Sequence, residues 1–153
     1  GQNGSFAGSG GTIEFSSGSF DLETGSTFTG TIALTNATLT IAPGVVVPSP
    51  GTFTQSGNSV LTGDGELDVS GSYLWTSGTQ SEGAGGTGMT RIAAGGSFTR
   101  AGNSSVNLTG RTLRIEGAGA VTTTATGTSI TLGSGGAIEV AATGTGLAGH
   151  DGP

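Results

Sequence analysis

The chain repeats one short motif about every 25 residues, and this repeat constrains the fold more than any other feature. The motif is an apolar residue or threonine, a variable residue and a large apolar residue, followed closely by small residues and glycine. Its copies read TIEFSSG, LTIAPG, LDVSG, TRIAAGG, LRIEGAG and IEVAATG, with the variable positions Glu14, Thr40, Asp68, Arg91, Arg114 and Glu139. Copies of one unit predict a structure built by stacking similar coils.

Each unit reads as two or three short β-strands separated by glycine and asparagine turns, and no stretch shows a helical period. A strand with one apolar face cannot bury that face alone, whereas stacked strands bury a continuous strip. We therefore predict an all-β fold, a β-solenoid (parallel β-helix) of about six coils of about 25 residues. The alternative is a β-sandwich, because short strands with frequent turns are also typical of that fold.

Stacking also predicts which side chains face the core, because alternate residues of a strand share a face. The last apolar residue of each motif should form one inward column, namely Phe15, Ile41, Val69, Ile92, Ile115 and Val140. The first residue should form a second column, namely Ile13, Leu39, Leu67, Thr90, Leu113 and Ile138. Elsewhere a second short strand precedes the motif, but in the fourth unit SEGAGGTG occupies its place, so we expect that strand to be absent there.

The composition restricts the classes of function. The length suits a single domain, 1–153, with 1–10 and 145–153 as terminal segments. A net charge of -6 with four arginines and no lysine makes nucleic acid and anionic membranes unfavourable partners. The absence of cysteine excludes disulfides and thiolate metal sites, and no apolar run is long enough to span a membrane. Abundant Ser, Thr and Gly favour an extracellular or cell-surface location.

Three stretches carry a resemblance to known proteins: LTGDGELDVSGSYLWTSGT at 61–79, TRIAAGGSFTRAGN at 90–103 and NLTGRTLRIEGAGAV at 107–121. In their style of repeat they resemble the repetitive β-solenoid segments of large bacterial secreted and surface proteins, of the adhesin and autotransporter-passenger type. That resemblance implies a stalk, adhesin or fibre whose repeats contain no catalytic residues. The chain is much shorter than such passengers, which favours a subunit or a fragment.

The segment LTGDGELDVSG contains three acids, Asp64, Glu66 and Asp68, at alternate positions. In an extended strand they would share a face, which suggests a calcium site or, together with the arginines, a polysaccharide lyase-like site. Calcium needs more oxygen ligands than this segment offers, and no lysine is available as a base. The structural interpretation is a ladder of cross-strand ion pairs, Asp68 with Arg91 and Arg114 with Glu139, which leaves Asp64 and Glu66 without partners.

Two further patterns suggest binding surfaces. Tyr73 and Trp75 alternate along one face and could stack on a sugar ring, or else pack at an edge or a subunit contact. Thr-x-Thr segments could form a flat threonine row of the kind that ice-binding solenoids have in common: TFT at 27–29 and 52–54, SFT at 97–99 and TTT at 122–124.

The single histidine, His150, lies in the tail GHDGP, and no Ser/His/Asp set can be assembled from it.

We expect a non-catalytic extracellular structural protein, a fibre-forming subunit or adhesin stalk. No amphipathic helix covers either end of the repeat, so the open strand edges should template end-to-end pairing of copies. Self-association is the expected partner interaction, with a glycan or cell surface as a further candidate, and we expect no cofactor, metal or catalytic residue. The alternatives are a glycan- or ice-binding surface module and a polysaccharide lyase-like enzyme.

Overall fold

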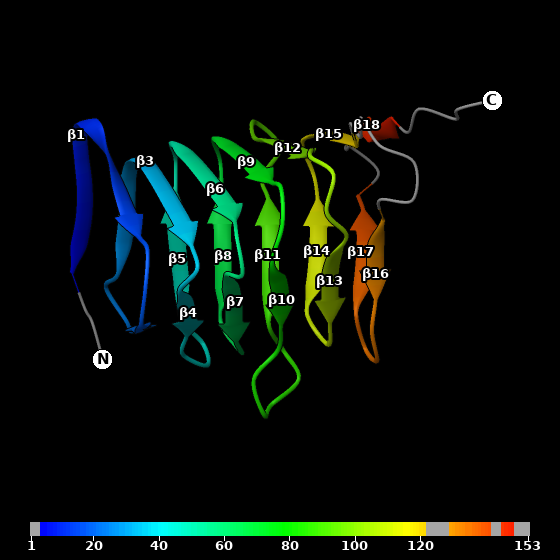
Figure 1. Ribbon diagram of the computed structural model, residues 1–153, viewed down its shortest axis with the longest axis horizontal. Coiled ribbons are helices and arrows are strands. Elements are labelled where there is room, and N and C mark those ends of the chain that lie inside the picture. The colour runs from blue at the N-terminus through cyan, green and yellow to red at the C-terminus, as the bar shows by residue number, and fades with distance from the viewer. Residues whose placement is uncertain (1–3, 122–128, 142–144, 149–153) are drawn as a thin grey trace.

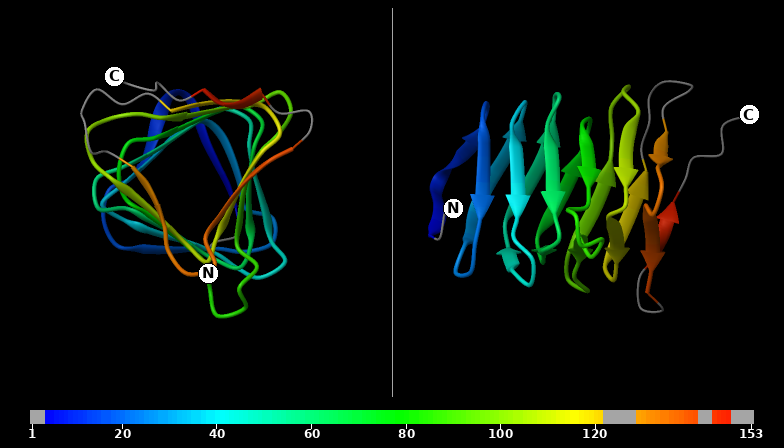
Figure 2. Two further views of the ribbon diagram at one scale, coloured as in Figure 1. Left: turned by 90° about the vertical axis from the view of Figure 1, so that its right-hand side faces the viewer. Right: turned by 90° about the horizontal axis from the view of Figure 1, so that it is seen from below.

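The computed structural model describes residues 4–121, 129–141 and 145–148. Its strands wind into a stack of coils, seen from the side in Figure 1 and along the axis in Figure 2. Each complete coil has three strands, one in each of three sheets that enclose a single core. The described residues form no helix that could cross a membrane. The predicted all-β solenoid of about six turns is confirmed.

Three sheets run along the rod, and we name them A, B and C. Sheet A contains β2 (Ser19–Leu22), β4 (Thr38–Ile41), β7 (Val60–Gly63), β10 (Thr79–Ser81), β13 (Val106–Thr109) and β16 (Ile130–Leu132). Sheet B contains β1 (Ser5–Phe15), β3 (Thr27–Thr35), β6 (Thr52–Ser56), β9 (Ser72–Trp75), β12 (Ser97–Arg100), β15 (Ala118–Val121) and β18 (Thr145–Ala148). Sheet C contains β5 (Val46–Ser49), β8 (Glu66–Val69), β11 (Met89–Ile92), β14 (Thr112–Ile115) and β17 (Ala137–Val140).

All described strand pairs are parallel, and each strand pairs with the strand of the same sheet one coil away. A β-sandwich would require antiparallel neighbours, so this alternative is wrong. The pairing register confirms the two predicted inward columns of sheet C over its last four strands, Leu67, Thr90, Leu113, Ile138 and Val69, Ile92, Ile115, Val140.

The first two copies of the motif lie in other sheets than predicted. The first belongs to β1 of sheet B and the second to β4 of sheet A. In sheet C the residue that pairs with Val69 is Ser49 of β5 and not Ile41. Glu14 and Thr40 therefore lie outside the outward column of sheet C that contains Asp68 and Arg91. Every strand of the solenoid has the same alternating pattern, so the spacing of copies does not reveal which of the three sheets a copy occupies.

A loop at 82–88 projects from the rod between β10 and β11 (Figure 1). The prediction that the fourth unit lacks a preceding strand is wrong, because β10 supplies it just before the loop. This insertion lengthens one coil. The paired residues Ser72 and Ser97 are 25 positions apart in the sequence, whereas the paired residues Thr52 and Ser72 of the preceding coil are 20 apart. The coils are therefore unequal in length, and only their strands superimpose along the axis.

Polar side chains share the core with the apolar columns. Gln55, Tyr73, Gln80, Thr90 and Arg111 are each at most 1% exposed. Tyr73 Oη donates to Gln55 Oε1 at 2.5 Å and accepts from Gln80 Nε2 at 2.7 Å. Thr90 Oγ1 donates to Gln80 Oε1 at 2.7 Å and accepts from Arg111 Nε at 3.1 Å. A continuous hydrogen-bonded chain therefore crosses the core, and burial there raises the pKa of Tyr73.

Arg111 ends this chain at the corner between sheets A and C. Its guanidinium donates to the carbonyl oxygens of Gly63 at 2.9 Å, Gly65 at 3.2 Å and Met89 at 2.5 Å. Burial lowers the pKa of Arg111 to about 10, so the side chain is still charged at neutral pH. Because its hydrogen-bond acceptors belong to the two preceding coils, Arg111 ties three coils together.

Replacing Tyr73 with Phe should lower the free energy of unfolding by about 1 to 3 kcal/mol, because two buried amides lose their shared partner. Urea denaturation measures this loss. The control is Ser72→Ala, which removes an exposed hydroxyl from the same strand and should change stability by less than about 0.5 kcal/mol. A Tyr73→Phe variant as stable as the parent chain would show that the buried chain contributes no stability.

Candidate functional site

The outer face of sheet C holds a charged cluster of Glu66, Asp68, Arg91, Arg114 and Glu116, which we call the acid–arginine cluster. Arg91 lies at its centre, with Nε 2.9 Å from Glu66 Oε1 and Nη2 2.9 Å from Asp68 Oδ2. Its Nη1 lies 3.3 Å from Glu116 Oε2, and Arg114 Nε lies 2.9 Å from Glu116 Oε1. The cluster therefore joins three successive coils through their side chains.

The predicted pair of Asp68 and Arg91 is confirmed. Arg114 does stand beside Glu139 in the register, but its ion pair goes to Glu116 and Glu139 is exposed. Glu116 lies two residues beyond Arg114, so the two side chains leave the same side of the chain. The prediction that Glu66 has no partner is wrong, because it pairs with Arg91.

Asp64 faces the loop at 82–88 instead of joining the cluster. Its carboxylate accepts hydrogen bonds from the backbone N–H groups of Gly83 at 3.0 Å, Gly85 at 2.8 Å and Thr87 at 3.4 Å. The bond from Gly85 is the largest of the effects that lower the pKa of Asp64 below its usual value. Asp64 therefore has a structural partner as well, contrary to the prediction, and it anchors the loop.

This arrangement leaves little of the acidic segment available for calcium or catalysis. Glu66, Asp68 and Glu116 converge on the guanidinium of Arg91, which occupies the place that a cation would need. Within the described ranges, no group of three or more acidic, histidine or cysteine residues could hold a metal ion. The geometry is that of an ion-pair ladder along the outer face of sheet C.

Tyr73 and Trp75 are 1% and 0% exposed, so the sugar-stacking surface and the edge or subunit contact suggested for them are both wrong. Both point into the core from β9, and the Trp75 indole Nε1 donates to the carbonyl oxygen of Ser77 at 3.1 Å. The prediction that these two side chains share one face of the strand is confirmed. The alternation of residues does not show whether that face is the inner or the outer one.

The threonine segments of sheet B do not stack as predicted. Thr27–Thr29 pairs with Ser5–Ala7, whereas Thr52–Thr54 pairs with Thr31–Ala33, so the two TFT segments lie in different positions. SFT at 97–99 pairs with β9, which contributes Ser72 and Leu74 to the outer face. The described part of this face mixes Thr, Ser, Ala, Leu and Glu instead of forming a threonine row. TTT at 122–124 and His150 lie outside the described residues.

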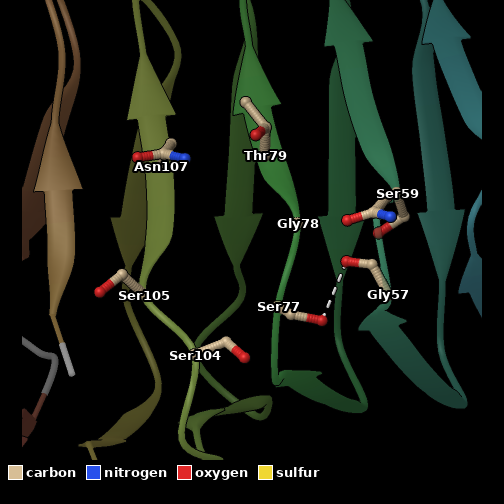
Figure 3. Close-up of a pocket in the computed structure, with 9 residues that line it drawn as sticks. Gly57, Ser59, Ser77, Gly78, Thr79, Ser104, Ser105 and Asn107 are labelled. Carbon is tan, nitrogen blue, oxygen red and sulfur yellow. Dashed lines mark hydrogen bonds between the residues drawn. The ribbon is translucent and has the colours of Figure 1, made fainter.

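A groove of about 400 Å³ lies at the corner where sheet B turns into sheet A (Figure 3). Three successive turns line it, through residues 57–59, residues 77–79, and Ser104, Ser105 and Asn107. All of these residues are glycine, serine, threonine or asparagine, so the lining is polar and uncharged. Sequence reasoning missed this groove because it exists only where three turns of unequal length are stacked.

Replacing Asp64 with Ala should release the loop at 82–88 with little effect on global stability. In NMR experiments the amides of Gly83, Gly85 and Thr87 should lose their downfield shifts and exchange faster by about tenfold or more. The control is Asp21→Ala, an exposed acid on β2. Unchanged loop amides would contradict the anchoring role.

The same anchor predicts a pH dependence. Because the folded-state pKa of Asp64 lies below its usual value of 3.8, the anchor is complete above that pH and is lost as the pH falls through the lowered pKa.

Replacing Arg91 with Leu should cost about 1 kcal/mol of stability at low salt, because three acids lose their shared partner on a partly exposed face. Replacing Arg114 with Leu should cost less, since it removes one ion pair. Denaturation at low and high NaCl measures both losses, which should shrink with salt. Equal losses for the two variants would contradict the central place of Arg91.

Comparison with known protein families, curated proteins and solved structures finds no match to this chain. The resemblance to repetitive solenoid segments of bacterial surface proteins holds for the stacked parallel coils. Membership of that family and a bacterial origin stay predictions.

Proposed function

We propose that the chain is a non-catalytic structural rod that extends by stacking a second copy against its last described coil. The observation that carries this proposal is the exposure of core positions there: Leu132 is 51% exposed and Val140 is 45% exposed. Leu132 follows the buried Leu108 in an inward column of sheet A, and Val140 follows the buried Ile115 in sheet C. Another coil would bury both side chains as their predecessors are buried.

The strand edges support the same arrangement. Within the described residues β16 ends sheet A on one side and β2 ends it on the other, and all pairs between them are parallel. An unpaired parallel edge is a template for a further strand. Head-to-tail stacking in register would place β16 beside β2 of the next copy and Leu132 beside its half-buried Phe20. Such a heterologous contact does not close, so it builds a filament.

We place this rod outside the cell, as a fibre subunit or adhesin stalk. The chain contains no cysteine and no lysine. Of its four arginines, Arg100 and Arg111 are buried and Arg91 and Arg114 are held in ion pairs. The rod therefore offers few accessible sites to proteases that cleave after basic residues, which suits a protein exposed to an extracellular environment.

The test is the assembly state of the full chain, measured by sedimentation velocity and negative-stain electron microscopy. We expect rods longer than one copy that lengthen with concentration. Leu132→Glu should abolish them, because it places a charge in the proposed joint. The matched control is Leu74→Glu, a half-buried leucine on the outer face of β9 in the middle of the rod, which should assemble normally.

Two outcomes would overturn the proposal. One is a parent chain that stays monomeric up to about 1 mM, since a joint that weak could not hold a filament together. The other is a Leu132→Glu variant that assembles as the parent does.

A further inference from the structure

The walls of the groove between sheets A and B are held from inside by a single inward column. This column of sheet B runs through Leu34, Gln55, Trp75 and Arg100. It is apolar at Leu34, in the coil before the groove begins. In the three coils whose turns line the groove its members each carry a hydrogen-bond donor, although all three side chains are at most 1% exposed.

The first two polar members bond to one wall. Gln55 Nε2 donates to the carbonyl oxygen of Thr79 at 2.9 Å, and Trp75 Nε1 donates to that of Ser77 at 3.1 Å. Ser77 Oγ in turn donates to the carbonyl oxygen of Gly57 at 3.0 Å, which ties this wall to its neighbour (Figure 3). The middle turn of the groove is therefore fixed by hydrogen bonds at both of its ends.

Arg100 holds the third wall. Its buried guanidinium donates to the carbonyl oxygen of Thr76 at 3.3 Å and also to those of Ala101 and Ser104. Thr76 directly precedes the groove residue Ser77, and Ser104 is a groove residue of the next coil, so one side chain sets the separation of two walls. Burial lowers the pKa of Arg100, and its charge is bonded to carbonyl groups and does not line the groove.

The groove is closely packed at Gly78 and holds an unused polar atom beside it. Gly78 has φ +96°, and a Cβ there would lie 2.5 Å from the carbonyl oxygen of Ser59, so glycine is required. Ser59 Oγ lies on the side of Gly78 that a Cβ would occupy, is buried and has no hydrogen-bond partner among the described residues. A buried hydroxyl without a partner is uncommon in a folded protein and leaves both a donor and an acceptor unused.

From this geometry we propose that the groove binds a short neutral saccharide. Its lining contains hydroxyl and amide groups and neither charges nor large apolar side chains, which complements a ligand with many hydroxyl groups and no charge. The volume of about 400 Å³ lies within the range of small-ligand sites. Three coils span about 10 Å along the rod, which gives the groove an elongated shape. Walls fixed in advance lower the entropic cost of binding.

The site lies on the side of the rod, away from the coil ends, so it does not depend on the proposed assembly. In the preceding coil the same column is closed by the apolar Leu34 and makes no such hydrogen bonds. Three buried polar side chains that each bond to a groove wall are what a preformed binding site requires.

Trp75 is the only tryptophan and its indole bonds to the groove wall, so its fluorescence reports on the site. The full chain would be titrated with cellohexaose, maltohexaose, xylohexaose and mannohexaose, and with hexagalacturonate as an anionic comparison. We expect saturable binding of at least one neutral hexasaccharide, with a Kd below about 1 mM, confirmed by calorimetry. Hexagalacturonate should bind at least tenfold more weakly.

Ser104→Phe should weaken saccharide binding by about tenfold or more, because the ring would fill the groove from an exposed position. Ser70→Phe is the matched control, since Ser70 is an exposed serine in a turn between sheets C and B, and it should bind as the parent does. Circular dichroism would verify that both variants are folded. The proposal is overturned if no neutral hexasaccharide binds up to about 10 mM, if Ser104→Phe binds like the parent, or if hexagalacturonate binds more tightly.

Discussion

The structure depends on the parallel backbone ladder that joins each strand to the strand of the same sheet one coil away. Its register decides at the same time what lies inside and what lies outside. In sheet C the pairing of Leu67 with Thr90 in the core is also the pairing of Asp68 with Arg91 on the surface. A slip of either strand by one residue would turn its own charge into the core, so apolar burial and surface ion pairs favour the same register. The ladder therefore holds the coils together and also sets their register.

A core this narrow brings polar groups to its corners, where the chain turns between sheets. The backbone carbonyl groups at these turns need donors, and the described core supplies them from Gln55, Trp75, Arg100 and Arg111. A buried guanidinium is costly unless its hydrogen bonds are made, so each of these contacts restricts how neighbouring coils can sit. Each of these polar contacts fixes one particular turn, whereas the apolar columns stabilise the stacking of all coils in the same way. The coils can therefore differ in length and still stack.

The outer faces of the three sheets differ in chemistry. Sheet C holds the acid–arginine cluster, whereas the outer faces of sheets A and B carry mainly hydroxyl and small side chains beyond Asp21 and Glu14. The proposed saccharide groove lies between sheets A and B and its lining is uncharged, and the proposed joint between copies lies at the end of the stack. End and side are separate surfaces, so a rod assembled in this way would repeat the groove along its length. That combination is consistent with a stalk that also holds a neutral glycan.

The sequence by itself determined the solenoid, the parallel stacking, the core columns of the last four strands of sheet C and the pair of Asp68 and Arg91. These follow from a two-residue alternation inside a longer repeat, which requires no knowledge of distant contacts. Only the tertiary structure decided that Tyr73, Trp75 and Arg100 point inward, that the first two motif copies lie in sheets A and B, that Glu66 and Asp64 have partners, and where the groove lies. Alternation separates the two faces of a strand, but the contact with the next coil chooses which face is buried. That choice depends on unequal turns and on polar atoms meeting backbone groups in neighbouring coils, neither of which is encoded in the spacing of apolar residues.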